Sequence, residues 1–513
     1  MSKDADVDMK DVELNEMDQE KQPMTGGEAG NGDGISPTGT EKNGAVKLKI
    51  PEEEDAKFTG LSKEELLKVA GTPGWVRTRW ALLVLFWLGW VGMLAGAVAI
   101  IIQAPRCKPL PKMNWWNNGP LYQVGDVAAF TGQNNLKGLA AKMENLNELK
   151  VKGLVLGPIH ETNPDDPQSL DFLKIASDVG TLEEFRNLIK IARKKSISVV
   201  LDLTPNYKGN QPWFSNGTVT DVTDKLKLAL VFWMREGIDG VQLSGIDRVV
   251  SVTPNQWADI RAIMQNSTSK DKNRALFGVT EKTSAVEVSN LLNSSGVDLL
   301  MSRVLWSNMT GVDRAQDVQH LYTSYNQTSL AWSLSDRTQG HLASLVNPKL
   351  LKLNQMLLFT LPGTPVFNYG DEIGLEDEQD SKFPRMPWGP LDPVAEMNDT
   401  EKERLSNRKF FCTLSDLRGK ERSLLHGDFR VLHNSTSCLA FLRQWDQSAG
   451  YLASFNWGEE PATLNIAHSS LPATATVTVS TDATAMPAGS SVQLETLQLG
   501  AGQAVLLQYP YIA

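Results

Sequence analysis

The sequence predicts a single transmembrane helix followed by a (β/α)8 barrel of the TIM type and a C-terminal antiparallel β-sandwich. Three observations support this α/β fold class: a charge-free apolar run, an alternation of short apolar runs with helical patterns, and a final stretch of Thr, Val, Ala and Ser alternation. The predicted parts are an acidic tail at 1–60, a juxtamembrane segment at 61–80, the transmembrane helix at 81–102, a stalk at 103–114, the barrel at 115–419 and the β-sandwich at 420–513.

The N-terminal tail is acidic and poor in apolar residues. The chain has 513 residues, 41% of them apolar, and a formal net charge of -10. This composition supports a large core but argues against nucleic-acid binding, which needs basic patches. Residues 1–60 contain a single aromatic residue, Phe58, so we expect a disordered cytosolic tail. Ser62, followed three residues later by Glu65, predicts a capping box that opens a short helix.

The run at 81–102 contains no charged residue and is long enough to cross a bilayer core, which needs about 20 apolar residues in a helix. A cleaved signal peptide does not fit, because some eighty residues precede the run. A core helix of a soluble protein would show a polar face, which this run lacks. Gly92 and Gly96 form a G-x-x-x-G spacing, typical of close helix packing in membranes.

Glycosylation sequons decide the predicted orientation, because basic residues are nearly balanced on the two sides of the apolar run. Every N-x-S/T sequon follows the run, which favours a lumenal or extracellular C-terminal part and a cytosolic N-terminus, that is, a single-pass type II topology. The candidate glycosylation sites are Asn216, Asn266, Asn293, Asn308, Asn326, Asn398 and Asn434.

The chain has three cysteines, so in an oxidising compartment one is left to pair between chains or to stay free. Cys107 lies five residues beyond the apolar run, on a stalk expected to have no folded neighbour. We predict an intermolecular disulfide there, against a free or lipid-modified thiol. For Cys412 and Cys438 both pairing and burial as free thiols remain open.

Eight short apolar runs predict eight parallel strands, separated by helical patterns such as Leu182, Phe185, Leu188 and Ile189. Strands alternating with helices form right-handed βαβ units, and eight of them close a barrel. The runs are PLYQ at 120–123, GLVLGPI at 153–159, SVVLDL at 198–203, GVQLS at 240–244, ALFGVT at 275–280, VDLLMSRV at 297–304, SLAWSL at 329–334 and PVFNY at 365–369.

Several of these stretches resemble the α-amylase family of glycoside hydrolases. LYQV at 121–124, the GTLEEF segment leading to VVLDLTPNY, and GTPVFNYGDEIG at 363–374 carry the likeness, which covers about 115–513. The resemblance implies a barrel followed by an antiparallel C-terminal domain. It also implies an active site at the carboxyl ends of the barrel strands.

The residues at the family's catalytic positions differ from those the chemistry needs. Retaining glycosidases use two carboxylates about 5 to 5.5 Å apart. The resemblance places Gln242 at the position of the family's arginine, Ser244 at that of the nucleophile, Val279 at that of the general acid and Thr338 at that of the third acid. A serine without an adjacent base is a poor nucleophile for this reaction. We therefore expect a barrel retained for its shape, with no catalytic residue.

The cleft wall is also reduced. Asp202 matches the family's third-strand aspartate, but the usual histidine of P-N-H is Tyr207. The insert between the third and fourth strands is represented only by about 208–224. Some relatives bind calcium through that insert, and this sequence has no His/Cys cluster, so we expect neither a metal nor a cofactor.

The whole arrangement of tail, single helix, juxtamembrane cysteine and inactive amylase-like ectodomain resembles the heavy subunits of the heteromeric amino-acid transporters. The resemblance implies a disulfide from Cys107 to a multi-pass light subunit, which the transmembrane helix also contacts. The heavy subunit would stabilise this partner and deliver it to the plasma membrane. The tail and helix of such proteins are further implicated in contact with β-integrins.

Two other functions remain open from the sequence. One is a membrane-tethered α-glucosidase that uses a displaced acid, Glu281 or Asp336. The other is an adhesion or receptor ectodomain in which Cys107 links two copies of the chain.

Overall fold

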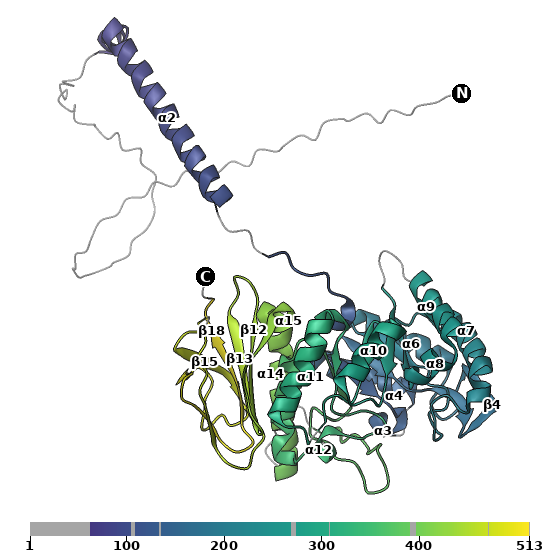
Figure 1. Cartoon of the computed structure of the whole chain (residues 1–513). Helices are drawn as coiled ribbons and strands as arrows, with labels where there is room; N and C mark the ends of the chain where they lie inside the picture. Colours follow the sequence, from purple (N-terminus) through teal and green to yellow (C-terminus); the bar gives the residue numbers. More distant parts are fainter. Residues whose placement is uncertain are drawn as a thin grey trace, which may run out of the picture. The chain divides into compact units, whose positions relative to one another are not determined.

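The computed structural model describes residues 62–103, 108–132, 135–267, 273–306, 308–389, 397–469 and 471–511. The chain divides into two compact units, Met1–Ala104 and Pro105–Ala513 (Figure 1). The predicted tail at 1–60 and Cys107 lie outside the described residues.

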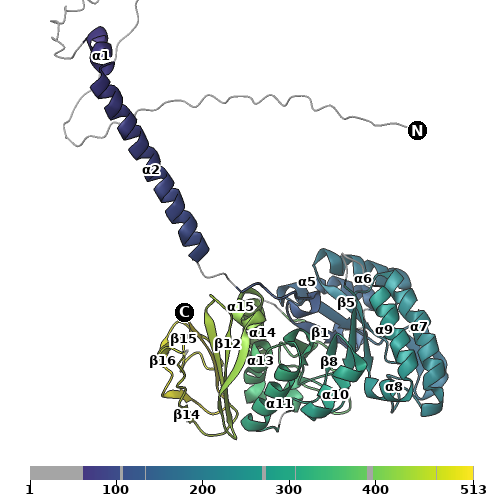
Figure 2. The ribbon, with the colours of Figure 1, turned by 45° about the horizontal axis from the view of Figure 1, so that its top comes forward.

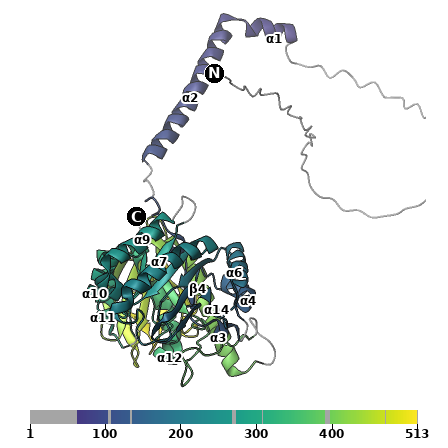
Figure 3. The same cartoon turned by 90° about the vertical axis from the view of Figure 1, so that its right-hand side faces the viewer.

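The described residues of the first unit form two helices, α1 (Lys63–Ala70) and α2 (Pro73–Gln103), which meet at a bend (Figure 3). The predicted capping box is confirmed, because Ser62 accepts from the Glu65 N–H and the Glu65 carboxylate accepts from the Ser62 N–H. Helix α2 spans 31 residues and is apolar enough to cross a membrane. It is about 46 Å long at 1.5 Å per residue, longer than a bilayer core. It begins eight residues before the predicted run because Pro73 suits a first helical turn.

The second unit is built on a parallel eight-stranded sheet with the order β8-β7-β6-β5-β2-β1-β10-β9. A lone bridge between Leu300 and Leu330 joins its two outer strands and nearly closes the barrel. The predicted barrel is confirmed, and each of the eight apolar runs overlaps one strand. The strands are β1 Leu121–Val124, β2 Gly153–Leu156, β5 Ser198–Asp202, β6 Gly240–Ser244, β7 Ala275–Val279, β8 Leu299–Met301, β9 Ala331–Trp332 and β10 Thr364–Asn368.

Amphipathic helices cover the outside of the barrel, with α7 and α9 side by side (Figure 2). Thr181 and Glu184 cap α6 reciprocally, and its apolar face, including Phe185 and Leu188, is buried against the sheet. The helices are α3 Val127–Thr131, α4 Leu136–Ala141, α5 Met143–Glu148, α6 Leu182–Lys194, α7 Val219–Glu236, α8 Ile246–Val252, α9 Pro254–Asn266, α10 Ala285–Ser295, α11 Gly311–Ser324, α12 Leu342–Leu345, α13 Leu351–Thr360, α14 Asp399–Lys420 and α15 Arg422–His426.

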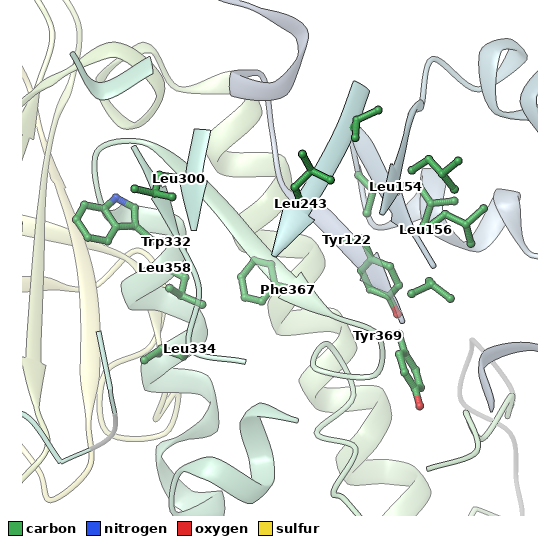
Figure 4. Packing of buried hydrophobic residues seen from close by; sticks show 14 of the residues in the cluster. Tyr122, Leu154, Leu156, Leu243, Leu300, Trp332, Leu334, Leu358, Phe367 and Tyr369 are labelled. Carbon is green, nitrogen blue, oxygen red and sulfur yellow. The ribbon is translucent and has the colours of Figure 1, made fainter. Parts of the chain in front are cut away.

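The barrel core has two layers, because successive side chains of a strand point to opposite faces. Val155 and Phe277 belong to the cluster inside the barrel, which Trp115 and Trp116 close at one end. Leu154 and Leu156 belong to the larger cluster between sheet and helices, part of which Figure 4 shows.

One antiparallel hairpin, β3 (His160–Asn163) and β4 (Asp166–Ile175), was not predicted. Only a few of its residues are buried, Leu170, Phe172 and Ile175 among those of β4. Its turn contains Asp165 with φ 56°, a conformation that Asp tolerates better than most residues. The hairpin lies against α7, where the Trp233 indole donates to the Phe172 carbonyl at 2.8 Å.

The C-terminal part is antiparallel, as predicted. A six-stranded sheet has the order β11-β12-β13-β18-β15-β16, and β14 pairs with β17. One face of the larger sheet joins the barrel core through residues such as Phe441 and Phe455, while Leu442 and Leu452 lie in a separate cluster. The strands are β11 Asp428–Asn434, β12 Cys438–Gln444, β13 Gly450–Asn456, β14 Ala462–Leu464, β15 Thr474–Ser480, β16 Ser491–Gln493, β17 Leu497–Leu499 and β18 Ala504–Tyr509.

The structure bears on two expectations, one for the cysteines and one for the stalk. Cys412 and Cys438 are both free thiols, so the possibility that they pair is not realised. The expectation that the stalk has no folded neighbour is wrong from Lys108 onward, because the Lys108 N–H donates to Asp446 at 2.9 Å.

Candidate functional site

The residues at the predicted catalytic positions lie at the carboxyl ends of the barrel strands. Gln242 and Ser244 share the inward face of β6, and Val279 ends β7 beside Ser244 in the sheet register. Thr338 lies in the turn that follows β9. A cavity of about 600 Å³ opens here and is lined by all four of these residues. The four positions that the resemblance identified therefore line one cavity.

Asp202 and Gln242 form the polar floor of the cavity. Asp202 is buried, and it accepts from the Thr204 N–H at 2.8 Å and from the Gln242 amide at 3.0 Å. Burial raises the pKa of Asp202, against the lowering effect of Arg337 and of these hydrogen bonds. Gln242 is thus a neutral hydrogen-bond donor to Asp202.

Ser244 is held through its main chain. Its N–H donates to the Thr204 hydroxyl at 3.0 Å, and its carbonyl accepts from the Trp213 indole at 2.8 Å. Val279, its register partner, carries no polar side-chain atom. The two neighbouring strand ends therefore present a hydroxyl and an aliphatic group to the cavity.

Arg303 organises the acids at the cavity mouth. Its guanidinium lies 3.0 Å from Glu281 and 4.0 Å from Asp336, and it donates to the Thr338 hydroxyl at 3.0 Å. The Glu281 side chain is 76% exposed. Both acids named as displaced candidates are thus paired with one arginine. Sequence reasoning missed Arg303, since its partners lie up to 35 residues away and no motif joins them.

Tyr207 and Arg337 cover the side of the cavity next to the β3–β4 hairpin. The Arg337 guanidinium donates to the Tyr207 carbonyl at 3.1 Å and lies 5.8 Å from the Tyr207 ring centroid. The Tyr207 hydroxyl donates to the His160 carbonyl at 3.0 Å. Burial raises the pKa of Tyr207 to about 12, so the phenol stays neutral at physiological pH. This side of the cavity is braced by contacts within the chain.

The other predicted sites lie on the surface of the described residues. A side-chain carbon built at Gly92 or at Gly96 meets no atom within 4 Å, so this face of α2 is open to a neighbour. The side chain of Asn216 lies outside the described part. The remaining sequon asparagines, Asn266, Asn293, Asn308, Asn326, Asn398 and Asn434, are exposed.

Comparison with known proteins settles the family. A model described as the N-terminus of solute carrier family 3 member 2 matches residues 46–122, and one for the α-amylase catalytic domain matches 124–221. The chain is 44% identical over 541 aligned residues to the amino acid transporter heavy chain SLC3A2 of Mus musculus, with all of each chain covered. It belongs to the amino acid transporter heavy chains. The resemblance inferred from the sequence is confirmed.

More distant relatives agree with this family and with the fold. The heavy chain SLC3A1 of Mus musculus is 23% identical and covers 92% of this chain, which covers 89% of that protein. The solved structure of the α-amylase from Geobacillus thermoleovorans matches with a TM-score of 0.60, at 19% identity, over 78% of this chain and 99% of that one. The trehalulose synthase MutB from Pseudomonas mesoacidophila matches with a TM-score of 0.61 at 14% identity, over 78% of this chain and all of that one. These structures bear on the fold alone.

Proposed function

We propose that this heavy chain is the non-catalytic subunit of a heteromeric amino-acid transporter, disulfide-linked through Cys107 to a multi-pass light subunit. Full-length identity to proteins named amino acid transporter heavy chains carries the proposal. The chain stabilises its partner and delivers it to the plasma membrane. Among the described residues α2 is the one helix suited to cross a bilayer, and a single helix cannot enclose a transport path.

The disulfide and the membrane helix have different tasks in this proposal. Helix association in lipid depends on close packing, because lipid tails are as apolar as the side chains. The open face at Gly92 and Gly96 allows such packing with a helix of the light subunit. Contacts of this kind are weak singly, and a covalent bond at Cys107 makes the pairing permanent.

The barrel end supports a non-catalytic role. Gln242, Ser244, Val279 and Thr338 stand where the family places its catalytic machinery, and none of them is a carboxylic acid. The cavity persists, yet its acids are engaged in hydrogen bonds and ion pairs within the chain.

The proposed topology places α2 as a type II signal anchor with the ectodomain outside the cell. The exposed sequons lie after α2, where glycosyltransferases of the lumen would reach them. In this topology the cytosolic tail and the helix contact β-integrins. Deletion of residues 1–60 tests the contact of the tail, because it should reduce the amount of integrin that co-precipitates with the chain.

A non-reducing gel of surface-labelled protein tests the covalent pairing. The wild-type chain should run in a high band that reduction dissolves and that contains a multi-pass transporter by mass spectrometry. Cys107→Ser should remove the band, while Cys412→Ser, a matched loss of a free thiol, should keep it. A band made of two copies of this chain would instead support the adhesion function and overturn the proposal.

The hydrolytic alternative is tested directly, because the cavity still holds Glu281 and Asp336. The full chain should release no glucose from maltose and no nitrophenol from 4-nitrophenyl α-glucoside. Hydrolysis that Glu281→Gln or Asp336→Asn abolishes would contradict the non-catalytic role.

A further inference from the structure

Trp306 lies two residues before a glycosylation sequon, and its side chain is exposed. The sequon is formed by Asn308, Met309 and Thr310. Trp306 is 47% exposed, whereas each other tryptophan described from residue 115 onward is buried or half-buried. One exposed apolar residue needs no explanation by itself. Its position relative to Asn308, however, gives it a candidate cover, namely the sugar that the sequon would carry.

The backbone that carries Trp306 and Asn308 is anchored. The Met309 N–H donates to the Trp306 carbonyl at 3.4 Å, which places Asn308 inside one reverse turn. The guanidinium of Arg314, which is 1% exposed, donates to the Trp306 carbonyl at 3.2 Å and also to the Met309 carbonyl. Leu305 and Met309 are themselves buried. The exposed indole and the exposed Asn308 amide are therefore held on one fixed segment.

The other sequons lack this arrangement. Phe214 has the same spacing before Asn216, but it is 5% exposed and belongs to the main core cluster. The residue two positions before each of the other five sequon asparagines is not aromatic. Among the described residues, Trp306 is therefore the exposed aromatic residue at this spacing from a sequon asparagine.

The sequon threonine also caps a helix. The Thr310 hydroxyl accepts from the Asp313 N–H at 3.1 Å and donates to the Asp313 carboxylate at 2.7 Å, which starts α11. The Gly311 N–H donates to the Thr436 carbonyl at 3.0 Å and so attaches this helix start to the turn between β11 and β12. A substitution of Thr310 would therefore disturb the fold as well as the sequon, and a substitution of Asn308 is the cleaner probe.

We propose that Asn308 carries an N-linked glycan whose first sugar lies on the Trp306 ring, an inference that rests on the proposed topology. The Asn308 side-chain nitrogen forms a bond to C1 of an oligosaccharide carried on a lipid diphosphate, and the diphosphate leaves with the amide proton. One face of a pyranose presents weakly positive C–H groups, whereas the face of an aromatic ring is negative. The two faces attract one another and exclude water, so the sequon supplies the cover of the ring.

The first test measures the cover on Trp306. The purified full chain in detergent is exposed to hydroxyl radicals, and mass spectrometry follows the oxidation of each tryptophan. Trp306 should be oxidised about three- to tenfold faster in Asn308→Gln than in the wild type. Asn266→Gln, which removes a different sequon, should match the wild type, and Trp445, which is 5% exposed, should react slowly in every protein. Equal oxidation of Trp306 in the wild type and Asn308→Gln would overturn the proposal.

The second test measures the same contact from the sugar. The full chain is produced with mannose-rich glycans, and an endoglycosidase cuts the native protein between the first two sugars of each glycan. Release from Asn308 should be about three- to tenfold faster in Trp306→Ala, whereas Trp306→Phe keeps a ring and should match the wild type. Release from Asn266 is the internal control and should be the same in all three proteins. Equal release from Asn308 in the wild type and Trp306→Ala would refute the stacking.

Failure of the proposed topology gives a different result. A cytosolic ectodomain would carry no glycan at any sequon, so glycosidase treatment would leave the gel mobility of the wild-type chain unchanged and both proposals would fall. Glycans at other sequons with none at Asn308 would overturn the present inference alone. The pairing of Cys107 with a light subunit affects neither measurement, because both use the purified chain.

Discussion

At the scale of single residues, several titratable groups are buried where they serve packing rather than chemistry. His160 is fully buried at the start of β3, between the rings of Phe172 and Tyr207, with centroids 4.8 and 5.1 Å away. One ring nitrogen lies 3.3 Å from the Pro205 carbonyl. Burial lowers the pKa of His160 to about 4, and the cations Lys208 and Arg337 act in the same direction.

His160 should make the stability of the ectodomain fall in acid. Its folded pKa lies below its unfolded value of 6.5, so the unfolded chain binds the proton more tightly. The contribution is complete above pH 6.5 and is lost as the pH falls towards 4. A shift of this size corresponds to roughly 3 kcal/mol. Urea unfolding of the full chain at pH 7.0 and 4.5 measures it.

The matched variant for this prediction is His160→Phe, which keeps an aromatic ring without the titration. As the pH falls from 7.0 to 4.5, the wild type should lose more unfolding free energy than the variant. A difference that is the same at both pH values would contradict the assignment. Glu372, whose pKa burial raises to about 7, acts with the opposite sign in both proteins and cancels in the difference.

At the scale of elements, buried arginines join helix α14 and strand β12 to the C-terminal end of α13 and to the loop that follows it. Arg418 donates to the carbonyls of Phe359, Leu361 and Gly363, and Arg443 donates to the Thr360 carbonyl at 2.8 Å. Both side chains are 1% exposed or less. Burial lowers the pKa of Arg418 to about 9, helped by the charge of Arg443, and the guanidinium stays protonated at neutral pH.

Arg418→Met should destabilise the ectodomain by about 3 to 5 kcal/mol, because it leaves buried carbonyls without their donor. Arg422→Met removes an exposed arginine of the adjoining helix α15 and should change the unfolding free energy by less than about 0.5 kcal/mol. Denaturant unfolding of the full chain compares the two. Equal effects would show that the carbonyl contacts of Arg418 do not stabilise the fold.

Elements were predictable from the sequence where apolar residues cluster, as in the eight barrel strands. The β3–β4 hairpin was not, because its buried residues are scattered among exposed ones over Asp166–Ile175. The strand-end positions of the cleft, such as Ser244, followed from the family likeness. Arg303 did not, because its partners Glu281 and Asp336 meet only when the strands close into a barrel. The hydrogen bond from the Lys108 N–H to Asp446 was missed because the two residues lie 338 positions apart in the sequence.

At the scale of the whole molecule, the barrel and the C-terminal sheet share one core. Phe411 of α14 and Phe359 of α13 lie in the same cluster as Phe441 and Phe455 of the sheet. The two parts therefore bury one another, unlike domains joined by a polar linker.

This shared core predicts a single cooperative unfolding transition for the ectodomain, visible by calorimetry of the full chain. A chain truncated after Gly427 would expose the apolar face that the sheet covers and should aggregate rather than yield a folded barrel. A matched truncation after Tyr509, the last residue of β18, should unfold like the wild type. Two separate transitions, or a soluble barrel from the shorter chain, would refute the common core.

The barrel should open most readily along the line where its sheet is not fully closed. Five residue pairs join β6 to β7, but a lone bridge between Leu300 and Leu330 joins the strand ends across the gap. Local opening requires the fewest broken hydrogen bonds there, so amide protons along this seam should exchange with deuterium before those of the neighbouring strands. Deuterium exchange within the barrel should therefore begin along one fixed line, between β8 and β9.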